Sequence, residues 1–112
     1  MDKVLEKFET EIRRGVMQVA VICLLDDEKY GYEIIKSLND AGLNVEEGTL
    51  YPLLRRLEGN ELLFSRWETS GPRPRKYYTV TEYGKEIRIK WLNSFNAVST
   101  VIERLEKNIQ GK

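Results

Sequence analysis

The chain has 112 residues with 18 basic and 18 acidic side chains, so its net charge of zero gives no indication of a nucleic-acid partner. This length fits one domain with a real hydrophobic core, and no apolar run approaches the roughly 20 residues that span a bilayer. The single cysteine excludes an internal disulfide framework and the acidic N-terminus is unlike a secretory signal, which together favour a cytoplasmic protein without membrane association.

The N-terminal part of the chain predicts a long helix over residues 2–26. Apolar residues recur there at spacings of three and four and form one stripe of a helix, made of Leu5, Phe8, Ile12, Val16, Val19 and Cys23. Because Cys23 lies in the apolar run VAVICLL, we expect it in the core. Residues 26–29 are a polar break.

Two shorter helices follow. Residues 30–40 predict the first, and Gly42 is suited to end it as a left-handed cap. The second runs to about Glu58 and carries an apolar stripe of Leu50, Leu53, Leu54 and Leu57. Proline is comfortable only in the first turn of a helix, so this helix either begins late, with Thr49 as its cap, or has a kink at Pro52.

The periodicity then changes. Residues 62–70 (LLFSRWETS) and 75–81 (RKYYTVT) are rich in aromatic and β-branched residues and predict two strands, joined by a loop at SGPRP. Thr81 is a good N-cap for a last helix that reaches about Asn108. Its apolar residues are spaced alternately by four and three and comprise Trp91, Phe95, Val98, Ile102, Leu105 and Ile109.

These elements predict a mainly α protein with a small β-hairpin, which is an α+β fold. Residues 1–80 would form a winged helix-turn-helix domain, and residues 81–112 a C-terminal dimerisation helix. With the leucine stripe of the third helix buried, Tyr51, Arg55 and Arg56 face outward, where they can meet DNA phosphates or base edges. The alternative is that the two arginines only form a solvated face.

The predicted hairpin carries a concentration of positive charge. Arg66, Arg73, Arg75 and Lys76 lie within eleven positions that contain one acidic residue, Glu68. Prolines on both sides of Arg73 stiffen the loop and lower the entropy lost when its arginines are ordered on a DNA backbone. A turn made soluble by its charges is the alternative.

The apolar stripes of the first and last helices are too long to be buried against a small hairpin. A two-fold dimer would bury both and would place two reading helices about one DNA turn apart, roughly 34 Å. The residues expected in this interface are Phe8, Ile12, Val16, Trp91, Phe95, Val98, Ile102 and Leu105. Packing of the aromatic stripe within one subunit is the alternative.

Three motifs together resemble the PadR family of bacterial transcriptional regulators, in particular its compact subfamily with a single C-terminal helix. They are YGYEIIKSL (30–38), GTLYPLLRRLE (48–58) and RKYYTVTEYGKE (75–86). One departure is Glu61, since the family usually has glycine there; Gly59-Asn60 could move the turn back.

The resemblance implies a sequence-specific DNA-binding repressor that acts as a homodimer on a palindromic operator. It implies DNA contacts, in addition to that expected of Arg56 from the outward arc, at Tyr30, Tyr32, Lys36, Thr49, Tyr51, Arg55, Arg73, Arg75 and Lys76. It also implies that a planar aromatic drug could stack on Trp91 and Phe95 at the dimer centre, although a closed, filled dimer core is the alternative.

Two other classes of protein are possible. An enzyme is disfavoured because the chain has no histidine, no Gly-rich phosphate loop and no spaced metal ligands. We therefore expect no catalytic residues, no metal and no cofactor. A winged-helix module that binds only proteins is the other alternative, and the zero net charge is its best support.

Overall fold

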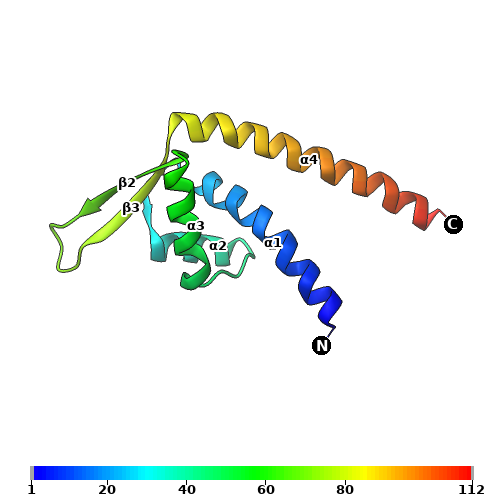
Figure 1. Cartoon of the computed structure of the whole chain (residues 1–112), viewed down its shortest axis with the longest axis horizontal. Coiled ribbons are helices and arrows are strands. Elements are labelled where there is room, and N and C mark those ends of the chain that lie inside the picture. The colour runs from blue at the N-terminus through cyan, green and yellow to red at the C-terminus, as the bar shows by residue number, and fades with distance from the viewer. Residues whose placement is uncertain (1, 112) are drawn as a thin grey trace.

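The computed structural model describes residues 2–111, over which four helices lie toward one end of a three-stranded antiparallel sheet whose β-hairpin projects away from them (Figure 1). The α+β class and the winged helix-turn-helix order predicted from the sequence are confirmed. In chain order the elements are α1 (Lys3–Leu24), β1 (Lys29–Tyr30), α2 (Gly31–Asp40), α3 (Glu47–Gly59), β2 (Leu63–Glu68), β3 (Arg75–Val80) and α4 (Glu82–Gln110).

Helix α1 contributes only its C-terminal half to the core. Met17, Val21 and Ile22, with Leu25 directly after the helix, are buried there in the same core cluster as the leucines of α3. Cys23 is exposed, so its predicted place in the core is wrong. At about 100° of rotation per residue it lies almost opposite the buried face, on the side that continues the stripe of the N-terminal half.

The turn between α2 and α3 is fixed by glycine. Gly42 has a φ of 104°, and its N–H donates to the carbonyl of Asn39 at 3.0 Å while that of Leu43 donates to Leu38 at 2.9 Å. These two bonds close the end of α2 as a left-handed cap, as predicted.

Helix α3 begins earlier than a start capped by Thr49 would allow. The carbonyl of Glu46 accepts from the N–H groups of Thr49 and Leu50, both at 3.0 Å, which makes Glu46 the N-cap. The prediction that Thr49 is the cap is therefore wrong, because its own N–H already belongs to the first turn. The helix continues through Pro52 to Gly59.

The C-terminus of α3 ends in the same left-handed geometry as the turn between α2 and α3, but without a glycine. Glu61 has a φ of 64°, its N–H donates to Glu58 at 2.9 Å, and the N–H of Leu62 donates to Leu57 at 2.9 Å. The turn has not moved back to Gly59 and Asn60. A side-chain-bearing residue therefore occupies a left-handed position that normally favours glycine.

The sheet order is β1-β3-β2, with β3 in the centre. The wing formed by β2 and β3 is in register from Leu63 opposite Val80 to Glu68 opposite Arg75. The sequence did not predict β1, because two residues are too few to show a strand period. It pairs Tyr30 with Tyr77 and so attaches the start of α2 to the wing.

Helix α4 starts directly from the end of the wing. The hydroxyl of Thr81 accepts from the N–H of Gly84 at 2.9 Å, which confirms Thr81 as the N-cap, and donates to the carbonyl of Glu61 at 2.7 Å. Beyond this joint α4 runs away from the sheet, and α1 and α4 diverge toward the two termini (Figure 1). Among residues 2–111 none of the helices is both long enough and apolar enough to cross a membrane.

Candidate DNA-binding surface

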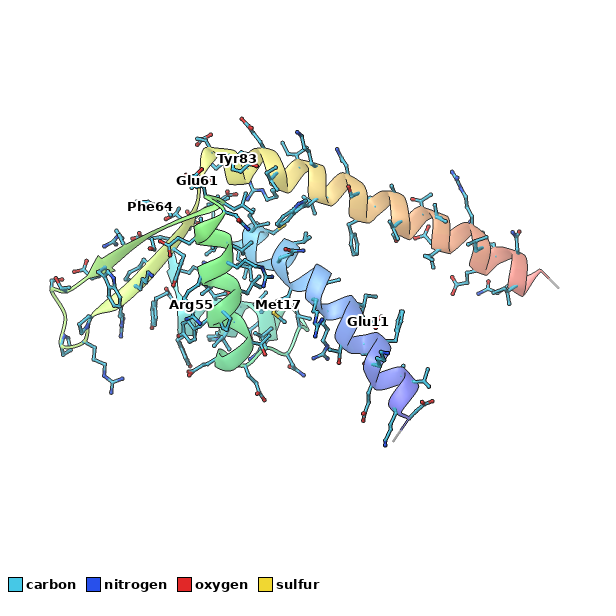
Figure 2. All side chains as sticks on the ribbon, in the orientation of Figure 1. Glu11, Met17, Arg55, Glu61, Phe64 and Tyr83 are labelled. Atoms are coloured by element: carbon cyan, nitrogen blue, oxygen red, sulfur yellow. The ribbon has the colours of Figure 1, made fainter. Side chains whose placement is uncertain are left out.

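Helix α3 presents two arginines on opposite edges of its exposed arc. Its leucine stripe is buried, whereas Arg55 and Arg56 are both exposed. Arg55 lies on the edge nearer the wing (Figure 2), one turn before Glu58, whose side chain contacts the wing. Arg56 lies on the other edge, where it lines a cleft between α3 and α1 together with Thr49. The arc therefore offers a cation to each side of a groove into which α3 could be inserted.

Tyr51 is half-buried and forms the contact between α3 and the start of α2. A β-carbon placed on Gly31 would come within 2.7 Å of its ring carbons, so only glycine leaves room for the ring at this point. Burial raises the pKa of the Tyr51 hydroxyl, and the negative charge of nearby Glu47 adds to the effect. The hydroxyl therefore keeps its proton and remains a hydrogen-bond donor.

The start of α2 carries the tyrosine pair expected near phosphates. The rings of Tyr30 and Tyr32 are stacked with centroids 6.4 Å apart, and Tyr32 is largely exposed. Lys36, one turn further along, forms an exposed ion pair with Asp40 at 3.1 Å. Such pairs contribute little free energy, so Lys36 can exchange this partner for a phosphate at low cost.

Two of the wing cations have no acidic partner within residues 2–111. These are Arg73, at the exposed tip, and Arg75, at the start of β3. The guanidinium of Arg75 lies over the Tyr30 ring, 4.5 Å from its centroid. Tyr77 meets Tyr30 edge-on at 5.5 Å, which completes a support that holds Arg75 in place while its charge stays available.

A third wing cation, Arg66, is neutralised within the subunit. Its guanidinium forms a bidentate ion pair with Glu28, with Nε 2.7 Å from Oε2, and a longer contact of 3.4 Å with Glu68. The bond from Arg66 lowers the pKa of Glu28. Bonds from Ser70 and then from Arg66 lower the pKa of Glu68 to about 2. Arg66 therefore fastens the wing to the segment before β1 and adds no net charge to the wing.

Lys76 is also held by an acidic partner. Its ammonium lies 3.4 Å from a carboxylate oxygen of Glu58, whose other oxygen accepts a hydrogen bond from Ser65. The same ammonium lies 6.0 Å from the ring centroid of Trp67, which is 61% exposed on this face of the wing. Lys76 thus connects β3 to the end of α3.

The predicted dimer and ligand residues gather along a second, apolar groove of about 610 Å³ between α1 and α4. Apart from Phe8 and Leu105 all of them line it, with Trp91 and Phe95 side by side in the lining. Beyond Trp91 the stripe of α4 is exposed, with Phe95 at 49% and Val98 at 63%. The alternative that this stripe packs within one subunit is therefore wrong for the residues after Trp91.

Comparison with known proteins decides the family. Residues 21–89, which include α2, α3 and the wing, match the Transcriptional regulator PadR-like family. The chain belongs to the PadR family. Its members are transcriptional regulators that bind DNA and are generally not enzymes.

Solved PadR structures share the fold over nearly the whole chain. A PadR family transcriptional regulator from Eggerthella lenta is 36% identical, with 93% of each chain covered and a TM-score of 0.86. A PadR-like transcription factor from Bacteroides fragilis is 32% identical with a TM-score of 0.75, covering 88% of this chain and 98% of its own.

A relative is also found by sequence. A transcriptional regulator from Mycobacterium tuberculosis is 38% identical over 67% of this chain and 71% of its own length.

Sequence reasoning missed several charged residues of this PadR surface. Glu28 and Glu58 are the partners of two cations that were expected to be free, and 38 positions separate Glu28 from Arg66. Arg13 and Arg14 line the cleft beside Arg56. They are adjacent in sequence, and that was the only signal available for them, because they lie off the apolar stripe of α1.

Proposed function

We propose that this PadR protein is a transcriptional repressor that acts in the cytoplasm as a homodimer on a palindromic operator. The observation that carries the proposal is the position of α3 beside the wing. Its exposed arc bears Arg55 and Arg56, and the wing beside it bears two cations, Arg73 and Arg75, with no carboxylate partner in the described chain. The zero net charge of the chain is an average over this basic face and acidic residues elsewhere, such as Asp26, Asp27 and Glu28 before β1.

The proposed DNA contacts divide into two kinds. Arg55 and Thr49 lie where base edges would be read, because they project from α3, which would enter the major groove. The others would contact phosphates from α2 and the residue before it, from the flanks of α3 and from the wing, and they are Tyr30, Tyr32, Lys36, Tyr51, Arg56, Arg73, Arg75 and Lys76. Phosphate contacts hold the protein in register, so the specificity of this surface depends on very few side chains.

The exposed apolar stripes support the homodimer. Phe8 and Ile12 on α1 are 58% and 51% exposed, and Ile102 and Leu105 on α4 are 59% and 54% exposed. A monomer would leave this continuous apolar surface in water, where large patches of this kind are unfavourable. A second copy related by a two-fold axis would cover the same patch on both chains.

The groove between α1 and α4 supports a response to a planar aromatic molecule. Its volume of about 610 Å³ lies within the usual range for small-molecule sites, and two aromatic residues, Trp91 and Phe95, offer faces for stacking. Because the groove adjoins the surface that we assign to the dimer, an occupant would change the angle between subunits and hence the distance between reading helices.

The test is binding to duplexes from the DNA upstream of the protein's own gene, measured by fluorescence anisotropy between about 50 and 300 mM salt. We expect specific binding whose logarithm falls linearly with that of the salt concentration. The variant Arg73→Ala/Arg75→Ala/Lys76→Ala should bind all sequences more weakly with a shallower slope, whereas Arg55→Ala should mainly lose specificity. Wild-type protein that binds no duplex even at the lowest salt concentration would favour a protein-interaction module. A reporter gene placed behind the bound sequence should be expressed less when the protein is present.

A further inference from the structure

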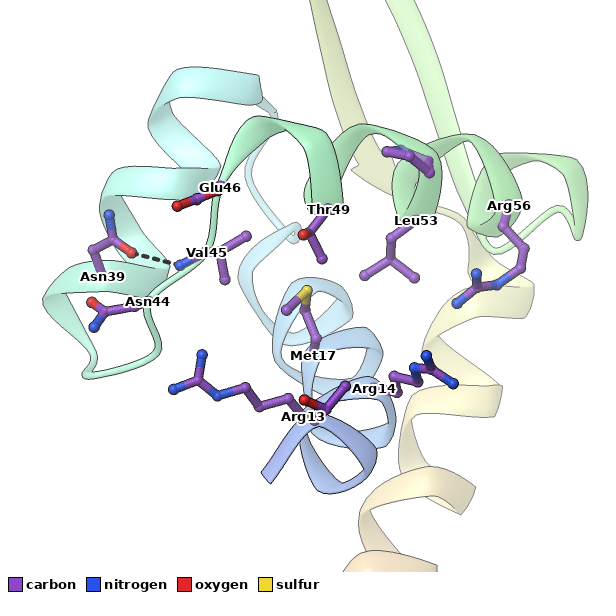
Figure 3. Close-up of a pocket in the computed structure, with 12 residues that line it drawn as sticks. Arg13, Arg14, Met17, Asn39, Asn44, Val45, Glu46, Thr49, Leu53 and Arg56 are labelled. Carbon is purple, nitrogen blue, oxygen red and sulfur yellow. Dashed lines mark hydrogen bonds between the residues drawn. The ribbon is translucent and has the colours of Figure 1, made fainter. Parts of the chain in front are cut away.

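The cleft on the far side of α3 from the wing has no part in the DNA contacts predicted from the sequence, apart from Thr49 and Arg56 on its edge. It lies between α1 on one side and the α2–α3 turn and α3 on the other, and its volume is about 890 Å³ (Figure 3). Its floor is apolar and belongs to the core, because Met17, Val45 and Leu53 are all buried. Its rim is polar, and three of its four charged residues are arginines.

Three arginines from two helices lie on this rim. Arg13 and Arg14 come from α1 and Arg56 from α3, and Arg14 and Arg56 point toward one another across the opening (Figure 3). Within residues 2–111 none of the three forms an ion pair. The lining includes one carboxylate, Glu46, so the cleft carries a clear excess of positive charge. The facing cations of Arg14 and Arg56 repel one another, and an anion bound between them would relieve this repulsion.

We propose that this cleft binds the phosphate backbone of DNA on the side of the recognition helix opposite the wing. The proposal rests on the DNA-binding function proposed above and extends it to α1, which carries none of the DNA contacts expected from the sequence. Two residues belong to both surfaces, since Thr49 and Arg56 line the cleft and also lie on the exposed arc of α3. A DNA strand that flanks α3 on this side would therefore pass the mouth of the cleft.

The chemistry of the rim suits phosphate. The planar guanidinium group offers two parallel donors to two phosphate oxygens, and its interaction is stronger than that of a neutral donor. With Arg73 and Arg75 on the wing side and Arg13, Arg14 and Arg56 on the α1 side, α3 would be held between both walls of the major groove. A free oxyanion would meet the same donors, so the experiment has to separate the two sources.

The test uses the full chain with Arg13→Ala/Arg14→Ala and a matched control, Lys90→Ala/Arg104→Ala. The control removes two exposed α4 cations that likewise form no ion pair within the described residues. Binding to a duplex of about 30 base pairs and arbitrary sequence is measured between about 25 and 200 mM chloride. In the cleft variant we expect about tenfold weaker binding and a salt slope shallower by about 0.9 for each phosphate that is no longer neutralised. The control should keep the wild-type slope, and Arg13→Lys/Arg14→Lys should restore most of it.

Three outcomes would overturn the proposal. The first is an unchanged slope in a folded cleft variant. The second concerns inhibition of DNA binding by inorganic phosphate, compared with chloride at equal ionic strength. If the cleft variant keeps the wild-type slope but loses the extra inhibition by phosphate, the cleft binds free oxyanions. The third is a monomeric cleft variant beside a dimeric control in light scattering, which would assign the cleft to a second copy of the chain. Wild-type protein that binds no duplex at the lowest chloride concentration would instead contradict the DNA-binding function itself.

Discussion

The ring of Tyr51 lies over Gly31 so closely that a β-carbon on the glycine would come within 2.7 Å of two of its ring carbons. One contact thus joins the first residue of α2 to the middle of α3. The half-buried tyrosine has to move if the glycine gains a side chain. The orientation of the reading helix therefore depends on a residue that contacts no DNA in our proposal.

We predict that Gly31→Ala lowers the free energy of unfolding by about 1–3 kcal/mol, because the added methyl group overpacks this contact. Chemical denaturation measures the change, and Gly59→Ala, where an added β-carbon meets nothing within 4 Å, is the matched control. The double variant Gly31→Ala/Tyr51→Ala should cost less than the sum of the single changes. Strict additivity of the two changes would contradict the contact.

The left-handed Glu61 provides a stabilising substitution. Its φ of 64° costs a non-glycine residue about 1–2 kcal/mol, although the greater entropy of glycine in the unfolded chain offsets part of the gain from replacing it. We predict that Glu61→Gly raises the free energy of unfolding by up to about 1 kcal/mol in urea denaturation. Glu61→Ala removes the same carboxylate but keeps the strain, so it should bring no such gain. Equal stability of these two variants would show that the backbone is unstrained.

The acidic partners of Arg66 predict a specific loss of stability in acid. The folded pKa of Glu68 is about 2, below its ordinary value of 4.5, and that of Glu28 is also lowered. Their stabilising effect is therefore complete above about pH 4.5 and is lost as the pH falls toward 2. The difference in free energy of unfolding between wild type and Glu28→Gln/Glu68→Gln should shrink over this range. In Glu103→Gln, which removes an α4 carboxylate without an ion pair among the described residues, the difference should change less.

The wing cations should separate into two groups. Arg73→Ala should weaken DNA binding while the free energy of unfolding stays within about 0.5 kcal/mol of wild type. Lys76→Ala should lower both quantities, because it also removes the ion pair with Glu58, which contributes up to about 1 kcal/mol. Glu58→Gln breaks the same pair but keeps the cation, so it should lower stability without weakening DNA binding. Stronger effects on stability from Arg73 than from Lys76 would contradict this division.

The apolar groove can be tested with its own tryptophan. The chain has two, Trp67 on the wing and Trp91 in the groove, so Trp67→Phe leaves a single reporter. We predict that a planar aromatic cation such as 9-aminoacridine quenches this fluorescence with a saturable curve, because it stacks on the indole face. The added change Phe95→Ala should weaken the apparent affinity. Absence of quenching at millimolar concentration would indicate a groove filled by the partner subunit.

The sequence was sufficient to predict features that depend on residues close together in the chain. The leucine stripe of α3, the glycine cap at Gly42 and the N-cap at Thr81 were all predicted, because each is encoded by neighbouring residues. Contacts between distant elements were not predictable in this way. The pairing of Arg66 with Glu28 spans 38 positions, and no periodicity indicates which carboxylate a folded chain brings to a given cation.

Errors in the prediction came from treating a helix as having one buried face. Helix α1 buries one side of its C-terminal half in the core and leaves another stripe exposed along its length, so Cys23 was assigned to the wrong one. The basic cleft was missed for a related reason. Arg14 and Arg56 face one another only because α1 passes beside α3 (Figure 3), and the position of one helix beside another cannot be read from the sequence of either helix alone.

The joint at Thr81 has a mechanical consequence. Its hydroxyl bonds to the turn after α3, at Glu61, and to the start of α4, at Gly84. A β-carbon on Gly84 would collide with the backbone of Leu62, so no loose segment separates the wing from α4. Helix α4 is thus a lever of about 44 Å with its fulcrum at the wing. One extra residue inserted after Gly84 would turn its apolar stripe by about 100° relative to the wing. The rotation of the α4 apolar stripe relative to the wing would therefore set the spacing between the two half-sites that a dimer can bind. It would matter as much for the operator as any side chain on α3.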